Sequence, residues 1–234
     1  MSEGKLFLIP TPLGDYPPEM VLTPSTLSLL QGIKLYFVEE LRTARRFLSA
    51  AGLKGRIESL SLHEINEHST VGKIEQLSHL LGKEDAALIS EAGLPAVADP
   101  GAKLVELAHK KGVTVVPCVG PSSLMMALMS SGMNGQCFAF TGYLPVKPEE
   151  RKAAILDIEK ISRQKKQTQI IIETPYRNDS LMNDLLKHCS GSTRICVAAD
   201  ITMESQYIVT KSVADWRKCP LTIGKRPCVF VLQG

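Results

Sequence analysis

Residues Ser90–Gly101, with the sequence SEAGLPAVADPG, form the stretch that decides the fold. The run before it, Ala86–Ile89, is short and apolar, and the residues after it, 104–108, carry apolar side chains at helical spacing. This order of strand, long loop and helix is half of a βαβ unit, whose loop normally has about two to six residues. Its two prolines restrict the backbone, and its two glycines permit backbone angles and close approaches that a side chain would prevent. It suits either an ordinary connection or a small-molecule pocket.

The alternation of strand and helix continues through the first half of the chain. Strands are predicted over residues 5–9, 35–38, 57–60, 86–89 and 113–116, and helices over residues 23–30, 42–51, 72–81 and 103–111. This alternation predicts an N-terminal doubly wound parallel sheet. The loops at 10–15, 39–42, 90–101 and 119–123 should then meet at the carboxyl edge of the sheet, where such folds bind ligands.

The second half is predicted to form a separate lobe. A new helix begins near Gly120, so we place the domain boundary between residues 1–118 and 119–234. Strands are expected over residues 137–141, 168–172, 194–199, 206–211 and 228–232, and helices over 124–131, 148–161 and 177–188. The last strands follow one another without helices, which favours a mixed sheet. The chain is therefore predicted to be a two-lobed α/β protein with a C-terminal mixed α/β sheet.

Composition is that of an ordinary globular protein, with 44% hydrophobic and 22% charged residues in a chain of 234. No apolar run approaches the roughly 20 residues that span a membrane, and residues 1–5 lack the apolar core of a signal peptide. We therefore expect a cytoplasmic protein without a membrane partner.

Metal binding and nucleotide-phosphate binding are not expected. The six cysteines contain no C-x-x-C pair, which favours buried free thiols. His63 and His68 are five residues apart, so on a helix they would diverge by roughly 140° and could not share one zinc ion. The dinucleotide motif G-x-G-x-x-G after a strand and the P-loop motif are both absent.

Basic residues are clustered although the net charge is only +3. One cluster holds Arg42, Arg45 and Arg46, of which at least one is expected to point into the cleft mouth while the others face solvent. Two others lie in the second half, at Lys147, Arg151 and Lys152 and at Lys160, Arg163, Lys165 and Lys166. These clusters suit either RNA contacts or solvated surfaces.

Ser122 and Ser123 follow Gly120 at the start of a helix. Serine is a common helix N-cap, and the free backbone N–H groups of such a start can also hold a carboxylate. The residues alone thus indicate an α/β enzyme that binds a small ligand, without identifying the ligand.

Six separated motifs carry a family resemblance. They are Pro10–Gly14 (PTPLG), Glu39–Arg42 (EELR), His63–Glu67 (HEINE), Ser90–Gly101, Gly120–Ser123 (GPSS) and Glu173–Arg177 (ETPYR). In order and spacing they resemble the tetrapyrrole methylase superfamily, and most closely its branch of small-subunit ribosomal RNA cytidine-2′-O-methyltransferases. The chain departs from that pattern at several positions, among them Asp15, Glu40, Leu41, Glu91 and Tyr176.

The resemblance implies S-adenosylmethionine as methyl donor, held between the two domains. The implied donor-binding residues are Pro10, Ser90, Ala92, Gly93, Pro95, Gly120, Pro121, Ser122, Ser123, Tyr143, Leu144, Glu173 and Thr174. Methyl transfer to a ribose hydroxyl needs alignment and removal of one proton. Candidate bases are Glu39, Glu64 and Glu67. Arg42, Arg45 and Arg177 are candidates for contacts with RNA phosphates.

The resemblance also implies ribosomal RNA or the small ribosomal subunit as substrate and a homodimer as the assembly. Two alternatives stay open. One is the same donor with a tetrapyrrole or other small acceptor, against which the basic clusters argue. The other is a non-catalytic S-adenosylmethionine-binding protein associated with RNA, which the departures at Glu40, Leu41 and Tyr176 keep open.

Overall fold

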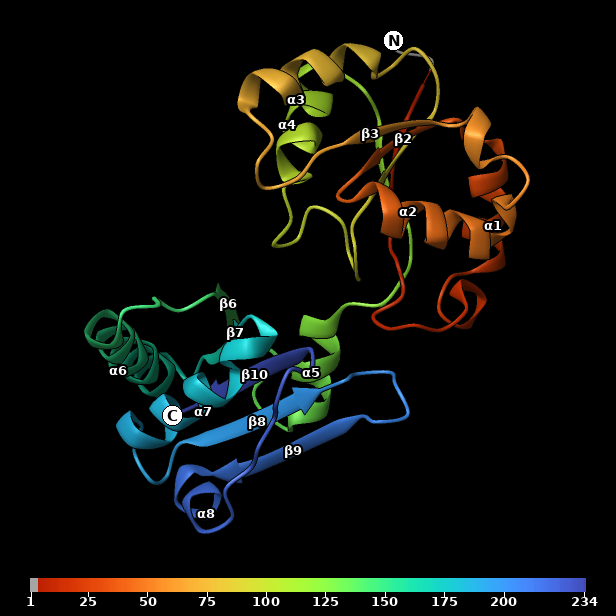
Figure 1. Cartoon of the computed structure of the whole chain (residues 1–234). Helices are drawn as coiled ribbons and strands as arrows, with labels where there is room; N and C mark the ends of the chain where they lie inside the picture. The colour runs from red at the N-terminus through yellow and green to blue at the C-terminus, as the bar shows by residue number, and fades with distance from the viewer. Residues whose placement is uncertain (1–3) are drawn as a thin grey trace. The chain divides into compact units, whose positions relative to one another are not determined.

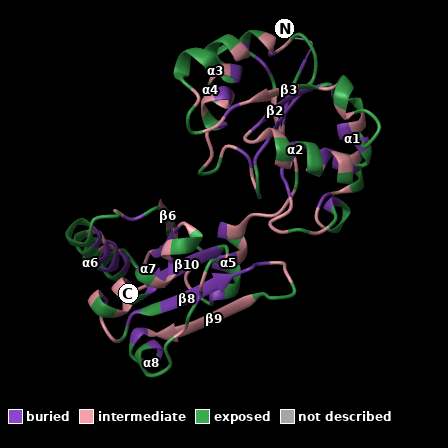
Figure 2. Ribbon diagram, viewed as in Figure 1, coloured by how far each residue is buried: buried purple, intermediate pink, exposed green. Residues whose placement is uncertain are grey.

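The computed structural model describes residues 4–234, and the chain divides into two compact units between Ser122 and Ser123 (Figure 1). Each unit contains one five-stranded sheet with helices packed on it. In Figure 2 the central strands of both sheets are buried, whereas the outer sides of the helices are exposed.

The first sheet has the order β3-β2-β4-β1-β5 and only parallel pairings. Its strands are β1 (Leu6–Ile9), β2 (Leu35–Val38), β3 (Ser61–Glu64), β4 (Ala86–Ile89) and β5 (Val115–Pro117). The predicted parallel sheet is confirmed. Because all strands run the same way, the loops that follow them meet at one edge.

Helices cover both faces of this sheet. They are α1 (Pro24–Gly32), α2 (Leu41–Leu48), α3 (Val71–Leu77) and α4 (Ala102–Lys110). Alternate side chains of β2 enter different cores: Tyr36 and Val38 lie in the core that includes residues of α1 and α2, and Leu35 and Phe37 in the core that includes residues of α3 and α4. This period of two is what a strand buried on both faces requires, and it makes the sheet doubly wound.

One predicted strand is wrong. Residues 57–60 contain the short 3₁₀ helix Ile57–Ser59, and the strand is the next segment, β3. The two apolar residues of the predicted strand, Ile57 and Leu60, are three apart, which matches the three-residue turn of a 3₁₀ helix, and both pack against the same core. Gly52, with φ of +94°, lies in the turn that follows α2.

Shorter helical segments complete the first unit. They are η1 (Pro18–Met20), η2 (Ser49–Leu53), η3 (Ile57–Ser59) and η4 (Ser78–Leu80). The helix predicted over residues 72–81 is therefore α3 followed by η4.

The second sheet has the order β6-β7-β10-β8-β9. Its strands are β6 (Phe138–Gly142), β7 (Thr168–Ile172), β8 (Arg194–Ala199), β9 (Tyr207–Ser212) and β10 (Cys228–Gln233). Only β6 and β7 pair in parallel, and the other pairings are antiparallel. The predicted mixed sheet is confirmed.

The helices of the second unit are α5 (Ser123–Ser131), α6 (Pro148–Lys165), α7 (Asn178–His188) and α8 (Val213–Lys218), with η5 (Pro175–Arg177) before α7. The sequence did not predict α8. Its N-cap is Ser212, whose side chain accepts from the Asp215 N–H, and its Trp216 is buried and donates to the Ile195 carbonyl at 2.9 Å.

The basic cluster near the start of α6 is only partly a surface feature. Arg151 is 5% exposed and its guanidinium bonds the Pro145 and Val146 carbonyls and the Asp184 carboxylate. A structural role therefore accounts for Arg151, in place of the RNA contact or solvated surface considered from the sequence.

The cysteines are free thiols. Three are buried, at Cys189, Cys196 and Cys228, but Cys219 is exposed, so burial does not hold for all six as the sequence suggested. Within residues 4–234 no helix is both long and apolar enough to cross a membrane.

Candidate functional site

Two loops at the carboxyl edge of the first sheet are bonded to each other. The Thr11 N–H donates to the Gly93 carbonyl at 2.9 Å, and the Gly93 N–H donates to the Thr11 carbonyl at 3.1 Å. The loops follow β1 and β4, which are neighbours in the sheet. The pairing of these two strands thus fixes the segment Ser90–Gly101 against the loop that begins at Pro10.

Glycines allow the loops to approach closely. A Cβ at Gly120 would lie 2.3 Å from the Pro10 Cβ, so position 120 has no room for a side chain. Gly93 has φ of +77°, and a Cβ there would lie 3.1 Å from Leu13 and 3.6 Å from the Pro121 carbonyl oxygen. The structure therefore brings together the predicted donor-binding residues of all three loops of the first unit.

These residues differ in how they face solvent. Ser90 and Pro95 are buried, and the Ser90 hydroxyl donates within its own loop to the Gly93 carbonyl at 3.4 Å. Ala92 is exposed, and Gly120–Ser122 are half-buried. Small residues with accessible backbone form a surface that an extended cofactor can approach. The first-unit residues therefore fit S-adenosylmethionine, with Ala92 and Gly120–Ser122 as the part open to it.

The predicted donor-binding residues of the second unit follow α5 and two parallel strands. Ser123 begins α5, Tyr143 and Leu144 follow β6, and Glu173 and Thr174 follow β7. Because β6 and β7 are parallel neighbours, the last two pairs lie at the same edge of the second sheet. Tyr143 is exposed, whereas Leu144 and Glu173 are buried.

Arg177 is held inside the second unit. Its Nη2 lies 2.7 Å from the Glu173 Oε1, and its Nε also donates to that oxygen at 3.0 Å. The Glu173 side chain is fully buried, and its Oε2 has no hydrogen-bond partner. The ETPYR motif is therefore a charged turn in which Arg177 neutralises Glu173.

A carboxylate pair lies at the edge of the first sheet. Glu39, at the end of β2, hydrogen-bonds to Asp99 of the loop after β4, and burial raises the pKa of both groups. The Asp99 Oδ1 accepts from the Gly101 N–H at 2.7 Å, while its buried Oδ2 has no donor from the rest of the protein. The neighbouring carboxylate also disfavours the charged form of Glu39, so burial and this neighbour both raise its pKa.

The neighbouring carboxylates have different roles. Glu40 is the N-cap of α2, and its side chain accepts from the N–H groups of Arg42 at 2.9 Å and Thr43 at 2.6 Å, which lower its pKa. Glu64 accepts from the Asn66 amide at 2.8 Å, and Glu67 is a solvent-exposed residue 3.5 Å from His68. Among the three predicted bases, Glu39 is the one built into the loop junction.

His63 and His68 do not lie on a helix as the sequence argument assumed. His63 is on β3 and His68 is in the turn that follows. Searching residues 4–234 reveals no group of three or more histidine, cysteine, aspartate or glutamate side chains that could hold a metal ion.

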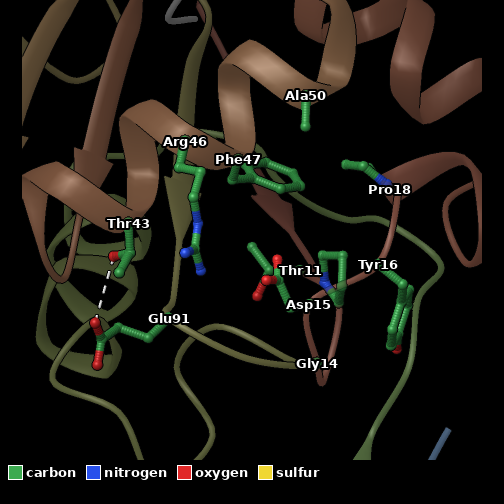
Figure 3. Close-up of a pocket in the computed structure, with 11 residues that line it drawn as sticks. Thr11, Gly14, Asp15, Tyr16, Pro18, Thr43, Arg46, Phe47, Ala50 and Glu91 are labelled. Carbon is green, nitrogen blue, oxygen red and sulfur yellow. Dashed lines mark hydrogen bonds between the residues drawn. The ribbon is translucent and has the colours of Figure 1, made fainter. Parts of the chain in front are cut away.

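A pocket of about 110 Å³ lies in the first unit (Figure 3), and one of its lining residues, Glu91, donates its backbone N–H to Glu39. It is lined by Thr11, Pro12, Gly14, Asp15, Tyr16, Pro18, Thr43, Arg46, Phe47, Ala50 and Glu91. The α2 contributors are spaced by three or four residues, so they form one face of the helix. Arg46 lines this pocket and Arg45 does not, while the expectation that an arginine of their cluster points into the cleft mouth stays a prediction.

The sequence analysis did not single out Phe47, Tyr16 or Asp99. The helical spacing of residues 43, 46, 47 and 50 was the signal that could have found the α2 face. No local signal joins Asp99 to Glu39, because their contact depends on the pairing of β2 with β4.

Solved structures share this fold. The methyltransferase CobJ matches with a TM-score of 0.64 over 99% of this chain and 95% of that one, at 14% identity. A uroporphyrin-III C-methyltransferase from Thermus thermophilus matches with a TM-score of 0.57 over 98% and 97%, at 17% identity. At these identities the likeness concerns the fold, and it agrees with the predicted fold class.

Sequence relatives are closer. Two proteins named ribosomal RNA small subunit methyltransferase I are similar along most of the chain. The one from Vibrio cholerae is 31% identical over 90% of this chain and 69% of its own length, and the one from Pseudomonas aeruginosa is 30% identical over 100% and 80%. The family model of tetrapyrrole (corrin/porphyrin) methylases matches residues 5–216. With two sheets in the expected arrangement and the motif loops joined at one sheet edge, the chain belongs to the tetrapyrrole methylases and is an S-adenosylmethionine-dependent methyltransferase.

Proposed function

We propose that this methyltransferase transfers a methyl group from S-adenosylmethionine to the 2′-hydroxyl of a cytidine in small-subunit ribosomal RNA. The observation that carries the proposal is the similarity, at about 30% identity along nearly the whole chain, to relatives named for that RNA. With this substrate the protein acts in the cytoplasm, where ribosomal subunits are assembled.

The chemistry assigned to the protein is alignment and proton removal. Bound S-adenosylmethionine supplies a methyl group on a positively charged sulfur, which leaves with the C–S bonding electrons. Ala92 and Gly120–Ser122 hold that donor, and Glu39 accepts the 2′-hydroxyl proton as the oxygen attacks the methyl carbon. Asp99 keeps the Glu39 carboxyl in place and shares its proton. Arg42 and Arg45, exposed residues in the first and the last turn of α2, contact RNA phosphates.

The test of the substrate is nucleoside mapping by mass spectrometry of small-subunit ribosomal RNA from a deletion strain. We expect one 2′-O-methylcytidine to disappear and to return when the wild-type gene is restored, but not the Glu39→Gln gene. Unchanged RNA together with an altered tetrapyrrole pool would favour a small acceptor. Unchanged RNA and tetrapyrroles would favour the non-catalytic alternative.

The donor site is tested by calorimetry with S-adenosylhomocysteine. Ala92→Leu adds bulk at an exposed position that the donor needs, so it should abolish binding without unfolding the protein. The matched control is Ala153→Leu, at an exposed position on α6. Gly93 is less suitable, because any side chain at its positive φ is strained with or without a ligand. Equal affinity of the two variants would contradict the site.

We also propose that the protein is a homodimer. The second unit exposes large apolar side chains on two elements, Met125 and Met129 on α5 and Phe138 and Phe140 on β6. Exposed apolar surface of this kind is typical of association sites. Sedimentation should show a dimer that Met129→Lys weakens, and a monomer at all concentrations would contradict the proposal.

A further inference from the structure

The first-unit pocket lined by Arg46, Phe47 and Tyr16 has room for at most a single ring. Its volume is about 110 Å³, and a protein cavity of about 150 Å³ is known to hold benzene. A macrocycle of four pyrrole rings cannot be enclosed in this space. A single pyrimidine base can enter it with its sugar outside.

The walls of the pocket suit a flat ring. Phe47 projects from α2, and Tyr16 and Pro18 come from the loop after β1 (Figure 3). The Tyr16 hydroxyl accepts from the Leu13 N–H at 3.1 Å, which fixes the ring at the loop. Aromatic and proline faces are the surfaces on which splayed-out RNA bases are commonly bound.

Arg46 supplies hydrogen-bond donors to the pocket. Its side chain points into the space in Figure 3, and within the described part of the chain its guanidinium has neither an ion pair nor a hydrogen bond. A guanidinium presents two parallel N–H groups, which match two adjacent acceptors on a ligand.

Glu91 supplies an acceptor on the same pocket. The Thr43 hydroxyl donates to its Oε1 at 3.3 Å, and its backbone N–H donates to the Glu39 Oε2 at 3.1 Å. Glu91 is thereby held by α2 on one side and by the candidate base on the other. The backbone of Glu91 consequently lies next to Glu39.

We propose that this pocket binds the cytosine base of the acceptor nucleotide, an inference that rests on the proposed function. The O2 and N3 atoms of cytosine are neighbouring acceptors for the Arg46 guanidinium, and its N4 amino group is a donor for Glu91. Uracil would keep the O2 acceptor but present an N3–H to the guanidinium and an O4 to the carboxylate, so one of the two guanidinium bonds would be lost and the contact with Glu91 would become repulsive. Binding of the base here sets its ribose beside the Glu39–Asp99 pair.

The experiment is an NMR titration of the ¹⁵N-labelled full chain, saturated with S-adenosylhomocysteine, with cytidine and with uridine. Free nucleosides carry no phosphate, so phosphate contacts cannot imitate base recognition. We expect cytidine to shift the amide signals of the pocket residues and to bind about tenfold more tightly than uridine. Arg46→Met and Glu91→Gln should each remove most of this preference. Lys54→Met, at an exposed position outside the pocket, should keep it.

Three results would overturn the proposal: no shift of pocket signals up to the solubility limit of cytidine, equal binding of both nucleosides, or displacement of cytidine by inorganic phosphate. Each is independent of the proposed function, which the methylation of ribosomal RNA tests. A protein that methylates its RNA but does not distinguish the nucleosides would retain the function and lose the base pocket. Cytidine selectivity without RNA methylation would retain the base pocket and contradict the proposed function.

Discussion

Two arginine clusters that look alike in the sequence have opposite surroundings in the structure. In the second unit, Arg151 is buried and bonded to two carbonyls, a serine and Asp184. In the first unit, Arg46 is exposed and its side chain has no partner among the described residues. A guanidinium bonded on all sides stabilises a fold, whereas one that lines a pocket without a partner is available to a ligand.

Carboxylates of the two units also differ in whether the protein compensates their charge. Glu159 of the second unit accepts from the Ser190 N–H and pairs with Arg163, so its charge is compensated within the protein. Glu39 and Asp99 of the first unit lie together, and within residues 4–234 neither of them is in an ion pair. Incomplete compensation of charge at the carboxyl edge of the first sheet is what distinguishes the candidate site from the rest of the molecule.

The largest expected effect separates the two arginines by stability. Arg151→Met removes a buried cation that bonds the Pro145 and Val146 carbonyls and the Asp184 carboxylate, so it should lower the free energy of unfolding by about 3 kcal/mol. Arg46→Met removes no contact of the folded protein and should change stability by no more than about 0.5 kcal/mol. Urea denaturation of both variants is the measurement. If the two variants lost similar amounts of stability, the different surroundings assigned to Arg151 and Arg46 would be contradicted.

The sequence predicted the sheets well because their strands are short apolar runs. Residues 35–38 and 86–89 are buried throughout, which requires apolar side chains on both faces and leaves a clear pattern. It failed at Ile57–Leu60, where two apolar residues three apart fit a 3₁₀ turn as well as a strand. Elements that depend on tertiary packing, such as α8 around Trp216, have weaker local signals.

For the candidate site, the sequence predicted which loops take part but not which of their residues contact one another. Glu39 and the loop Ser90–Gly101 were found because they follow apolar strands. The Glu39–Asp99 contact arises from the neighbouring positions of β2 and β4, an order that no local pattern encodes. Whether an arginine is buried and bonded or exposed likewise depends on the tertiary neighbours of its side chain. The sequence therefore could not distinguish Arg46 from Arg151.

The next prediction concerns folding stability against pH. The adjacent carboxylates Glu39 and Glu40 should contribute to stability with opposite pH dependence. Burial raises the pKa of Glu39 in the folded state, so its contribution favours folding below the ordinary pKa of glutamate and is lost as the pH rises through the folded value. Glu39→Gln should therefore become progressively more stable than the wild type as the pH is raised from about 4 to about 8. Its amide can still bond Asp99.

Glu40 should behave in the opposite way. Its pKa is lowered by the backbone N–H groups that it caps, so its stabilisation is present above the ordinary glutamate pKa and is lost as the pH falls through the folded value. Glu40→Gln should be less stable than the wild type at neutral pH and approach it in acid. Urea unfolding over the same pH range tests both variants, and parallel pH profiles would contradict the assigned surroundings.

The smallest expected effect tests whether the first cluster, rather than the second, meets RNA. If Arg42 and Arg45 contact phosphates of single-stranded RNA, the slope of log affinity against log salt should become shallower by about 0.7 for each arginine changed to alanine. Over a fourfold change in salt this amounts to only about a 2.6-fold difference in affinity. Lys152→Ala, in the cluster that contains the buried Arg151, should leave the slope at the wild-type value. The measurement is filter binding of small-subunit ribosomal RNA fragments from low to physiological salt, with S-adenosylhomocysteine affinity as the control for folding. A slope that falls for Lys152→Ala but not for Arg42→Ala would assign the RNA surface to the second unit and reverse the comparison.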